Sequence, residues 1–527
     1  MGFYLNPTSR KFQINLNSRI YVDKSGLIEE TNAHVNTQQR YLCVSRPRRF
    51  GKSMAADMLA AYYGSGEDTR ALFAGLKIAK APTFEAHLNQ YNVIKINMQE
   101  FLSLTHSMDE MLSLLQDEIK RELINAYPDA RALNLVWTMK DVYGQTGKPF
   151  VILIDEWDCL FREYQNDLES QKKYLDFLRL WLKDQEYVGL AYMTGILPIK
   201  KYGTHSALNM FMEYSVTNPR ELAEYFGFTE DEVRSLCDEY EMSFEEAKSW
   251  YDGYELTTQS REGTIAHNMY SPKSVVEAML SHEYGPYWNQ TETYEALKIY
   301  IQMNYDGLKD AVIRMLAGDS VPIDIGGFTN DMTTFRNADD VFALLVHLGY
   351  LTYDSREKTV KIPNKEVSAE YVTAIKRMEG WGEVMRSVEA SKKLLESLWE
   401  RDASAVAEAL DRAHEEISIL RYNDENSLSC AIHLAFYFAK EYYTVIRELP
   451  TGKGFADICL IPRKLYADKP AVVIELKKDL SAKGAIDQIK ERNYVRALQD
   501  YRGNLLLCGI NYGADKKHTC VIEKMEI

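Results

Sequence analysis

The chain has 527 residues, of which 46% are hydrophobic and 12% aromatic, and its formal net charge is −15. This length predicts about three to four domains of ~100–200 residues each, and the composition is that of a folded protein rather than a disordered one. The negative charge excludes a global electrostatic field that would draw the whole protein to nucleic acid or to anionic lipid.

The seven cysteines are scattered along the chain, and no two of them form a Cys-x-x-Cys pair. Such spacing fits a reducing compartment and argues against a disulfide framework or a zinc site. No apolar run approaches the ~20 residues that a transmembrane helix needs, and the N-terminus has no apolar signal-peptide segment. We therefore expect a cytoplasmic protein that makes no membrane contact.

The first informative segment is residues 41–64, where a β-rich run is followed by RPRRFGKS and then by a helical pattern. Strand, loop and helix in this order are the setting of a phosphate-binding loop. Backbone N–H groups would hold the phosphates, the lysine would pair with their charge, and the serine would bind Mg²⁺. The residues expected to contact nucleotide are Arg49, Phe50, Gly51, Lys52, Ser53 and Met54.

This loop departs from the pattern G-x-x-x-x-G-K-[ST], because Arg46 occupies the position of the first glycine. That glycine mainly eases a turn, so its loss does not remove the groups that hold phosphate. The alternative is a basic turn capped by Gly51, and this motif alone leaves both interpretations open.

A second motif, GKPFVILIDEWDCLF, has an apolar run that ends at Asp155 and Glu156. Such a run suits a strand buried on both faces, and open α/β sheets bind ligands at the carboxyl ends of their strands. Asp155 would hold Mg²⁺, and Glu156 would polarise the attacking water. A third apolar run, YVGLAYMTG, places Thr194 where it would sense the γ-phosphate, although threonine also ends strands for ordinary turn reasons.

The middle of the chain predicts a short helix and two β-rich runs around a charged turn (residues 341–367), which is how a winged helix ends. Few basic residues cluster there, which favours a lid or docking module over DNA binding. Residues 366–420 are helical and charged, and they predict a packed helical connector. A coiled coil is not expected, because heptads do not persist.

Near the C-terminus, strict alternation in AVVIELKK puts Glu475 and Lys477 on one face of a strand. An adjacent antiparallel strand, FADICLIP, would bring Asp457 beside Glu475. Two carboxylates that hold Mg²⁺ and a lysine that orients the nucleophile suit phosphodiester hydrolysis. The alternative is an edge strand with a cross-strand ion pair. Residues 443–527 contain 15 Lys and Arg against 11 Asp and Glu, so this segment is locally basic.

Along nearly its whole length, the chain resembles the predicted AAA-ATPase-like proteins of bacteria and archaea that carry a C-terminal PD-(D/E)XK nuclease-superfamily domain. In that family RPRRFGKS is the usual form of the phosphate loop, so the resemblance favours a nucleotide-binding loop over a basic turn. Two departures are Trp157, where tyrosine is usual, and Ser271, where asparagine is usual. The resemblance is carried by RIYVDKSGLIEE, RPRRFGKS, ILIDEWD, TGILPIKKYGTHSALNMF, FGFTEDEV, WYDGYEL and LLVHLGYLTYDSREKTVKIPNKEV.

The resemblance implies an α/β protein with a P-loop NTPase (AAA-like) domain, a winged-helix-like and helical middle region, and a C-terminal α/β restriction-endonuclease-like domain of the PD-(D/E)XK type. The expected boundaries are 1–215 for the ATPase core, 216–290 for a helical extension, 291–370 for the winged-helix-like domain, 371–420 for the connector and 421–527 for the nuclease-like domain.

The implied function is ATP binding and hydrolysis coupled to a metal-dependent nuclease-like domain that acts on nucleic acid, with DNA favoured over RNA. ATP and Mg²⁺ are the expected cofactors. The alternative is an ATPase switch or scaffold whose nuclease-like domain only binds nucleic acid or protein. The expected catalytic residues are Glu156, Asp457, Glu475 and Lys477, with Asp457 and Glu475 as metal ligands.

The resemblance implies further, accessory site residues of the nuclease-like domain at four positions, namely Glu425, Glu448, Gln488 and Tyr494. A homo-oligomeric ring, which the resemblance allows, would need a cation that reaches the neighbour's nucleotide. Candidates for that cation are Arg220, Lys200 and Lys201.

Overall fold

The structure is a computed structural model that describes residues 2–199, 208–260, 263–288, 295–303, 305, 307–328, 335–376, 378, 380–416, 432–451, 454–463, 466–491 and 503–525. It contains two compact units, and each has its own hydrophobic cores. The first unit comprises Met1–Thr291 and Pro322–Val367, and the second comprises Glu292–Val321 and Ser368–Ile527. The finer division into five domains stays a prediction.

A five-stranded sheet with the order β2-β3-β4-β1-β5 forms the centre of the first unit, and its neighbouring strands are parallel. Every residue of β1, β3 and β4 is buried, as expected for apolar strands covered on both faces. The strands are β1 (Tyr41–Ser45), β2 (Asn92–Asn97), β3 (Phe150–Asp155), β4 (Val188–Gly195) and β5 (Met212–Tyr214).

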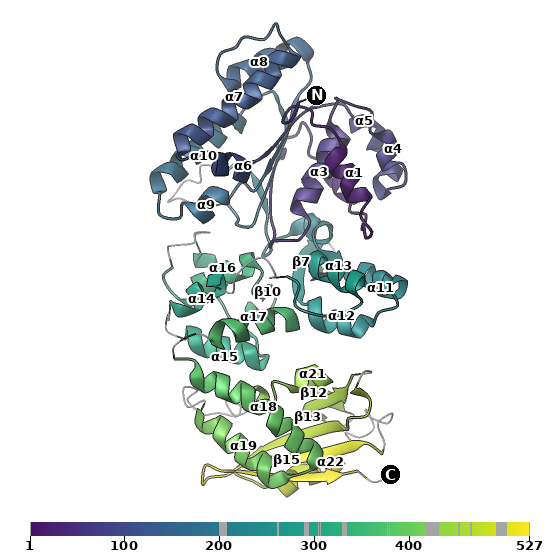
Figure 1. The fold of residues 1–527 in the computed structure, drawn as a ribbon, viewed down its shortest axis with the longest axis vertical. Helices are drawn as coiled ribbons and strands as arrows, with labels where there is room; N and C mark the ends of the chain where they lie inside the picture. Colours follow the sequence, from purple (N-terminus) through teal and green to yellow (C-terminus); the bar gives the residue numbers. More distant parts are fainter. Residues whose placement is uncertain are drawn as a thin grey trace. The chain divides into compact units, whose positions relative to one another are not determined.

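Helices cover both faces of this sheet (Figure 1). One layer contains α1 (Arg10–Leu16), α2 (Gly26–Asn32), α3 (Lys52–Tyr63), α4 (Arg70–Phe73), η1 (Lys77–Lys80) and α5 (Phe84–His87). The other contains α6 (Met98–Leu104), α7 (Met108–Ala126), α8 (Leu135–Thr146), α9 (Cys159–Glu163) and α10 (Leu168–Leu182). This arrangement places the loop that precedes α3 at the carboxyl end of β1, between β4 and β5 in the sheet.

The remainder of the first unit has a small antiparallel sheet in the order β6-β8-β7 with helices packed on it. Its elements are η2 (Arg220–Tyr225), β6 (Phe228–Thr229), α11 (Glu230–Glu239), α12 (Phe244–Tyr251), β7 (Tyr254–Ser260), β8 (Gly263–Tyr270) and α13 (Pro272–Ser281).

The short helix and the two strands predicted around residue 350 are present in the structure. After η3 (Ile325–Gly327), helix α16 (Ala338–Leu348) leads into an antiparallel pair, β10 (Thr352–Asp354) and β11 (Thr359–Lys361). The boundary between the two units passes through β9 (Val321–Pro322) and α17 (Lys365–Lys376). The winged-helix interpretation and the lid or docking role stay predictions.

The second unit has a five-stranded sheet in the order β12-β13-β14-β15-β16, in which only the β14–β15 pair is parallel. One face packs against α18 and α19, and the other packs against α22. The strands are β12 (Tyr443–Thr451), β13 (Gly454–Pro462), β14 (Ala471–Lys478), β15 (Leu505–Tyr512) and β16 (His518–Lys524). The helices are α14 (Glu295–Gln302), α15 (Leu308–Ala317), α18 (Gly382–Glu400), α19 (Ala403–Glu416), α21 (Ala439–Tyr442) and α22 (Ala482–Glu491). Both units are α/β structures, as expected from the sequence.

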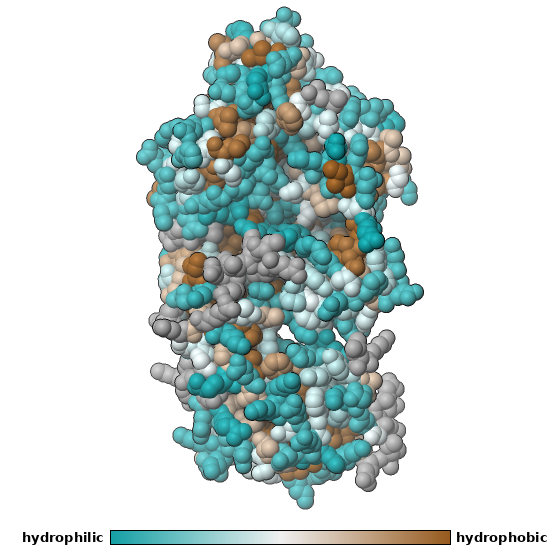
Figure 2. Space-filling view, in the orientation of Figure 1, coloured by the Kyte–Doolittle hydropathy of each residue, from teal (hydrophilic) through white to brown (hydrophobic). Residues whose placement is uncertain are grey.

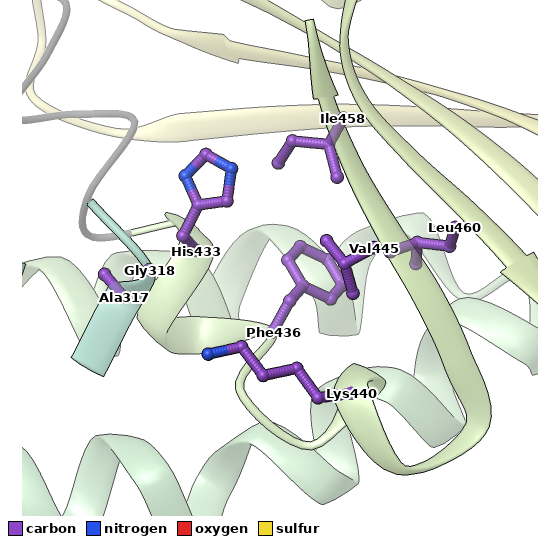
Figure 3. A pocket seen from close by; sticks show the side chains of 8 residues that line it. All are labelled: Ala317, Gly318, His433, Phe436, Lys440, Val445, Ile458 and Leu460. Atoms are coloured by element: carbon purple, nitrogen blue, oxygen red, sulfur yellow. The ribbon is translucent and has the colours of Figure 1, made fainter. Parts of the chain in front are cut away.

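A cavity of about 300 Å³ lies in the second unit where the end of α15 meets the sheet (Figure 3). Its walls include Phe436, Val445 and Ile458, and Lys440 Nζ donates a hydrogen bond to the Leu316 carbonyl at 3.1 Å. A cation at the carboxyl end of a helix is favourable, because carbonyl groups there lack intrahelical donors. This lysine therefore links the end of α15 to α21 (Ala439–Tyr442).

The face of the molecule drawn in Figure 2 is mainly hydrophilic, and its hydrophobic residues lie in small separate groups. Among the residues described, no helix is both long enough and apolar enough to cross a membrane.

Candidate nucleotide-binding and metal sites

The predicted phosphate loop connects the end of β1 to the start of α3. Gly51 precedes the helix in a left-handed conformation (φ 85°), which glycine adopts without strain. A Cβ atom at this position would have no neighbour within 4 Å, so the glycine serves the backbone conformation and leaves open space beside the first turn. The free N–H groups of that turn are available to an anion.

Arg46, which replaces the first glycine of the motif, is fully buried. Its Nη1 donates to the carbonyls of Ser45 (2.9 Å) and Tyr214 (2.6 Å), and its Nη2 donates to the carbonyl of Leu222 (3.2 Å). Burial lowers the pKa of Arg46 to about 10. The side chain therefore joins β1, β5 and η2, and this structural role explains why an arginine occupies the position.

Replacing Arg46 with methionine should destabilise the first unit by about 2–4 kcal/mol, because three buried carbonyls would lose charged donors. The midpoint of urea unfolding, followed by tryptophan fluorescence, measures this change. Arg70→Met is the matched control, since the Arg70 side chain forms an exposed pair with Glu85 and its loss should leave the midpoint nearly unchanged. Equal midpoints for both variants would contradict the structural role of Arg46.

Lys52, the motif lysine, is buried at the first position of α3. Its Nζ donates to the carbonyls of Arg46 (3.0 Å) and Pro47 (2.9 Å). Burial lowers the pKa of Lys52, and the negative charges of Glu156 and Asp155 oppose that change. The ammonium group therefore lies within electrostatic range of both predicted acids.

The other predicted loop contacts differ in exposure. Arg49, Ser53 and Met54 are exposed, which leaves the serine hydroxyl accessible. Phe50 is buried, and its ring packs edge-on against Tyr254 with centroids 5.1 Å apart. The side chain of Phe50 therefore anchors the loop, and only its backbone is left for a phosphate. The nucleotide contacts of all these residues stay predictions.

The acidic motif ends β3, which pairs with β4, and β4 pairs with β1. Asp155 is buried, and its Oδ1 accepts hydrogen bonds from Thr194 Oγ1 and from the Glu156 N–H (3.1 Å). Neighbouring parallel strands thus bring Thr194 and Asp155 together at one edge of the sheet. Thr194 contacts the predicted magnesium ligand directly, and its sensing of the γ-phosphate stays a prediction.

Glu156 adopts a left-handed backbone conformation (φ 54°), which is uncommon for a residue with a side chain. Its Oε2 accepts a hydrogen bond from Arg162 Nη2. Burial raises the pKa of the Glu156 carboxyl, and the charge of Arg162 opposes this. A carboxylate held in this way beside a lysine and a second carboxylate is suited to activate water.

Sequence reasoning missed two residues of this site, Asp158 and Arg162. The buried Asp158 Oδ2 accepts from the N–H groups of Ile196 (3.0 Å) and Leu197 (2.8 Å), and it lies 3.5 Å from Arg162 Nε. The only sequence signal was the second aspartate of DEWD with an arginine four residues later, a spacing typical of a helical ion pair.

In the C-terminal sheet, β13 and β14 are antiparallel, with Ile458 opposite Ile474. Asp457 and Glu475 each lie one residue beyond this pair in their strands. Asp457 Oδ2 accepts from the Leu476 N–H at 2.7 Å. This bond joins Asp457 to the residue that follows Glu475, and the sharing of one metal ion by the two carboxylates stays a prediction.

The buried Glu475 carboxylate accepts hydrogen bonds from two of the other predicted residues. Its Oε1 accepts from Lys477 Nζ at 3.0 Å and from Gln488 Nε2, which α22 contributes. Within the described ranges, no group of three or more His, Cys, Asp and Glu side chains could hold a metal ion. Asp457 and Glu475 offer carboxylates, a donor type that Mg²⁺ prefers, and their role as metal ligands stays a prediction.

Several predicted positions lie where the structure gives no side chain. Glu425, Tyr494, Lys200 and Lys201 are outside the described residues, and Glu448 lies in β12 without a described side chain. Arg220, the remaining oligomer candidate, is exposed, and its guanidinium lies 5.7 Å from the centre of the Tyr214 ring. Its role stays a prediction.

Two family models match the chain. Residues 10–204 match a family described as predicted AAA-ATPase, and residues 424–523 match the PD-(D/E)XK nuclease superfamily. Over 366 residues the chain is 24% identical to the uncharacterized protein in the vnfD 5'region of Azotobacter chroococcum mcd 1. That match covers 66% of this chain and 65% of the relative, so the chain spans less than two thirds of the relative's length.

Two solved structures also show a distant likeness. One is Cdc6p from Pyrobaculum aerophilum, at 9% identity and a TM-score of 0.28, covering 71% of this chain and 99% of that one. The other is the Aeropyrum pernix ORC2 protein in ADPNP–ADP complexes, at 10% identity and a TM-score of 0.23, covering 67% of this chain and 93% of that one. Because both TM-scores are low, the identification of the two domains rests on the family models.

Proposed function

Since the chain carries an AAA-ATPase-like domain over residues 10–204 and a PD-(D/E)XK nuclease-superfamily domain over residues 424–523, we propose that it hydrolyses ATP and couples this to a metal-dependent nuclease. One observation carries the proposal: Lys52, Asp155, Glu156 and Thr194 lie at the carboxyl ends of the adjacent strands β1, β3 and β4. Such an edge is where open α/β sheets bind their ligands.

In the ATPase half, the N–H groups at the start of α3 would hold the phosphates, and the Lys52 ammonium would pair with their charge. Ser53 and Asp155 are the residues that would hold Mg²⁺, and they are oxygen donors of the type this ion prefers. When bound, the ion would neutralise part of the phosphate charge. Glu156 would orient the attacking water and accept its proton.

In the nuclease half, Asp457 and Glu475 would hold a divalent ion, which supplies an activated water when bound. Lys477 and Gln488 both reach Glu475 and would keep its carboxylate in place. The local excess of Lys and Arg in residues 443–527 supports nucleic acid as the substrate, and we favour DNA over RNA.

A second candidate function is an ATPase switch or scaffold whose nuclease-like domain only binds nucleic acid or protein. The observation that favours it is the small donor set, because the described side chains include two carboxylates at this site and no larger metal-binding group. Metal-dependent nicking of plasmid DNA by the full chain distinguishes the two functions, since a binding module would retard the DNA without cutting it.

Lys52→Ala tests the nucleotide site. ATP affinity, measured by titration calorimetry with Mg²⁺, should fall by about 10–100-fold, because a charged hydrogen bond of about 1.5–3 kcal/mol is lost. Lys173→Ala is the matched control, since Lys173 pairs with Asp109 on the surface and should bind ATP as the wild type does. Unchanged ATP affinity in Lys52→Ala, with an unchanged melting temperature, would argue that the loop is only a basic turn.

A further inference from the structure

Arg162 is a cation of the proposed ATPase site that the phosphate-loop and acidic motifs do not contain. It lies in the short helix α9, its side chain is only 12% exposed, and its Nη2 donates to Glu156 Oε2. The charge of Arg162 acts on both Lys52 and Arg48, lowering the pKa of each in addition to the effect of burial. Arg162 therefore lies within electrostatic range of Lys52, the lysine of the predicted phosphate loop.

The two carboxylates that contact Arg162 are held differently. Asp158 has a fully buried side chain and accepts two backbone N–H groups from the segment after β4, so its position is fixed. Glu156 has a side chain that is 25% exposed, and its carboxylate contact in the described structure is the one with Arg162. Arg162 is thus tethered on one side and has an exchangeable partner on the other.

We propose that Arg162 is an arginine finger supplied by the same chain: bound ATP draws its guanidinium from Glu156 to the γ-phosphate, and this exchange frees Glu156 to orient the attacking water. The inference rests on the proposed ATPase function. A guanidinium binds phosphate in a bidentate manner, and the triphosphate carries more negative charge than one carboxylate. Asp158 keeps the arginine within reach of either partner.

Hydrolysis then proceeds by attack of this water on the γ-phosphate. The water oxygen forms a bond to the γ-phosphorus, and the bond from that phosphorus to the bridging oxygen breaks, with its electron pair leaving on ADP. The water proton passes to Glu156 and then to the released phosphate. Arg162 stabilises the charge on the transferring group, a contribution of about 10³–10⁵ in rate for arginine fingers. No arginine from a neighbouring subunit is required.

Arg162→Ala, Arg162→Lys and a control, Arg131→Ala, test this inference in the full chain. Arg131 pairs with Asp141 on the surface of the same unit. Affinities for ATP and for ADP are measured by calorimetry, and single-turnover hydrolysis is followed with radiolabelled ATP. Arg162→Ala should bind ATP about 10-fold or more weakly while ADP affinity stays within about 2-fold, and its hydrolysis rate should fall by about 10³-fold. Arg131→Ala should match the wild type in all three measurements.

A second readout is the dependence of wild-type activity on protein concentration. Activity per molecule should stay constant from nanomolar to micromolar protein, because the arginine comes from the same chain. Arg162→Lys, which keeps the charge and is expected to fold, decides the outcome if the alanine variant unfolds: it should show the same ATP-selective loss in milder form. An unchanged ratio of ATP to ADP affinity, or faster hydrolysis without Arg162, would overturn the inference. A wild-type chain that binds no nucleotide would instead overturn the proposed ATPase function.

Discussion

Replacing Glu156 with glutamine should slow ATP hydrolysis by about 10²–10⁴-fold and leave ATP affinity close to the wild-type value. An amide cannot accept the proton of the attacking water, although its oxygen still accepts the hydrogen bond from Arg162. The structure of the site should therefore persist while the chemical step stalls. Single-turnover hydrolysis measures the chemical step, and calorimetry with Mg²⁺ and ATP measures binding.

Glu163→Gln is the matched control for this experiment, because Glu163 lies in the same short helix as Arg162 and contacts Gln99 rather than the site. It should hydrolyse ATP at the wild-type rate. If Glu156→Gln also turns over at that rate, another group activates the water, and the assignment of Glu156 as the base is wrong.

Replacing Asp457 with asparagine should reduce phosphodiester cleavage by about 10³-fold or more, because a metal ligand loses its charge and several kcal/mol of transition-state stabilisation are lost. Asparagine still offers an oxygen to the Leu476 N–H, so β13 and β14 should keep their pairing. ATP turnover should not change, because Lys52 and Asp457 belong to different compact units. Nicking of a plasmid and of labelled single strands with Mg²⁺ or Mn²⁺, with and without ATP, measures the loss.

Two further variants sharpen this test. Asp468→Asn removes an exposed carboxylate in the turn before β14, and it should cut as the wild type does. Lys477→Ala should reduce cleavage and retain Mn²⁺ binding, which calorimetry measures, since lysine is not a metal ligand. If the wild type binds Mn²⁺ through Asp457 but cuts no substrate with or without ATP, the binding-module function is the correct one.

The two domain types and the fold class were accessible from the sequence. The family models that match residues 10–204 and 424–523 confirm the domain types, and the two α/β units confirm the fold class. The strands at residues 41–45, 150–155 and 188–195 were predictable because a strand buried on both faces must be apolar throughout. The antiparallel pairing of the strand that contains Asp457 with the strand that contains Glu475 was also predictable. Alternation in AVVIELKK determines which residues share a face of the strand.

The partners of the charged side chains were not predictable from the sequence. Arg46 and Arg49 are both arginines in one loop. Arg46 is buried and donates hydrogen bonds to three carbonyls, whereas Arg49 is exposed. Arg162 lies in a short helix with no motif of its own, and only folding brings it to Glu156. Such contacts join segments whose approach depends on how the strands and helices pack.

The sequence by itself therefore determined the strands, the strand–loop–helix order at residues 41–63 and the face that Glu475 shares with Lys477, because periodicity and turn chemistry act between residues close in the chain. Tertiary structure decided that Arg46 supports the loop from the core, that Thr194 contacts Asp155, and that Arg162 holds Glu156. A buried charge must find its partners wherever the fold places them, since an unpaired charge in the interior is too costly to persist.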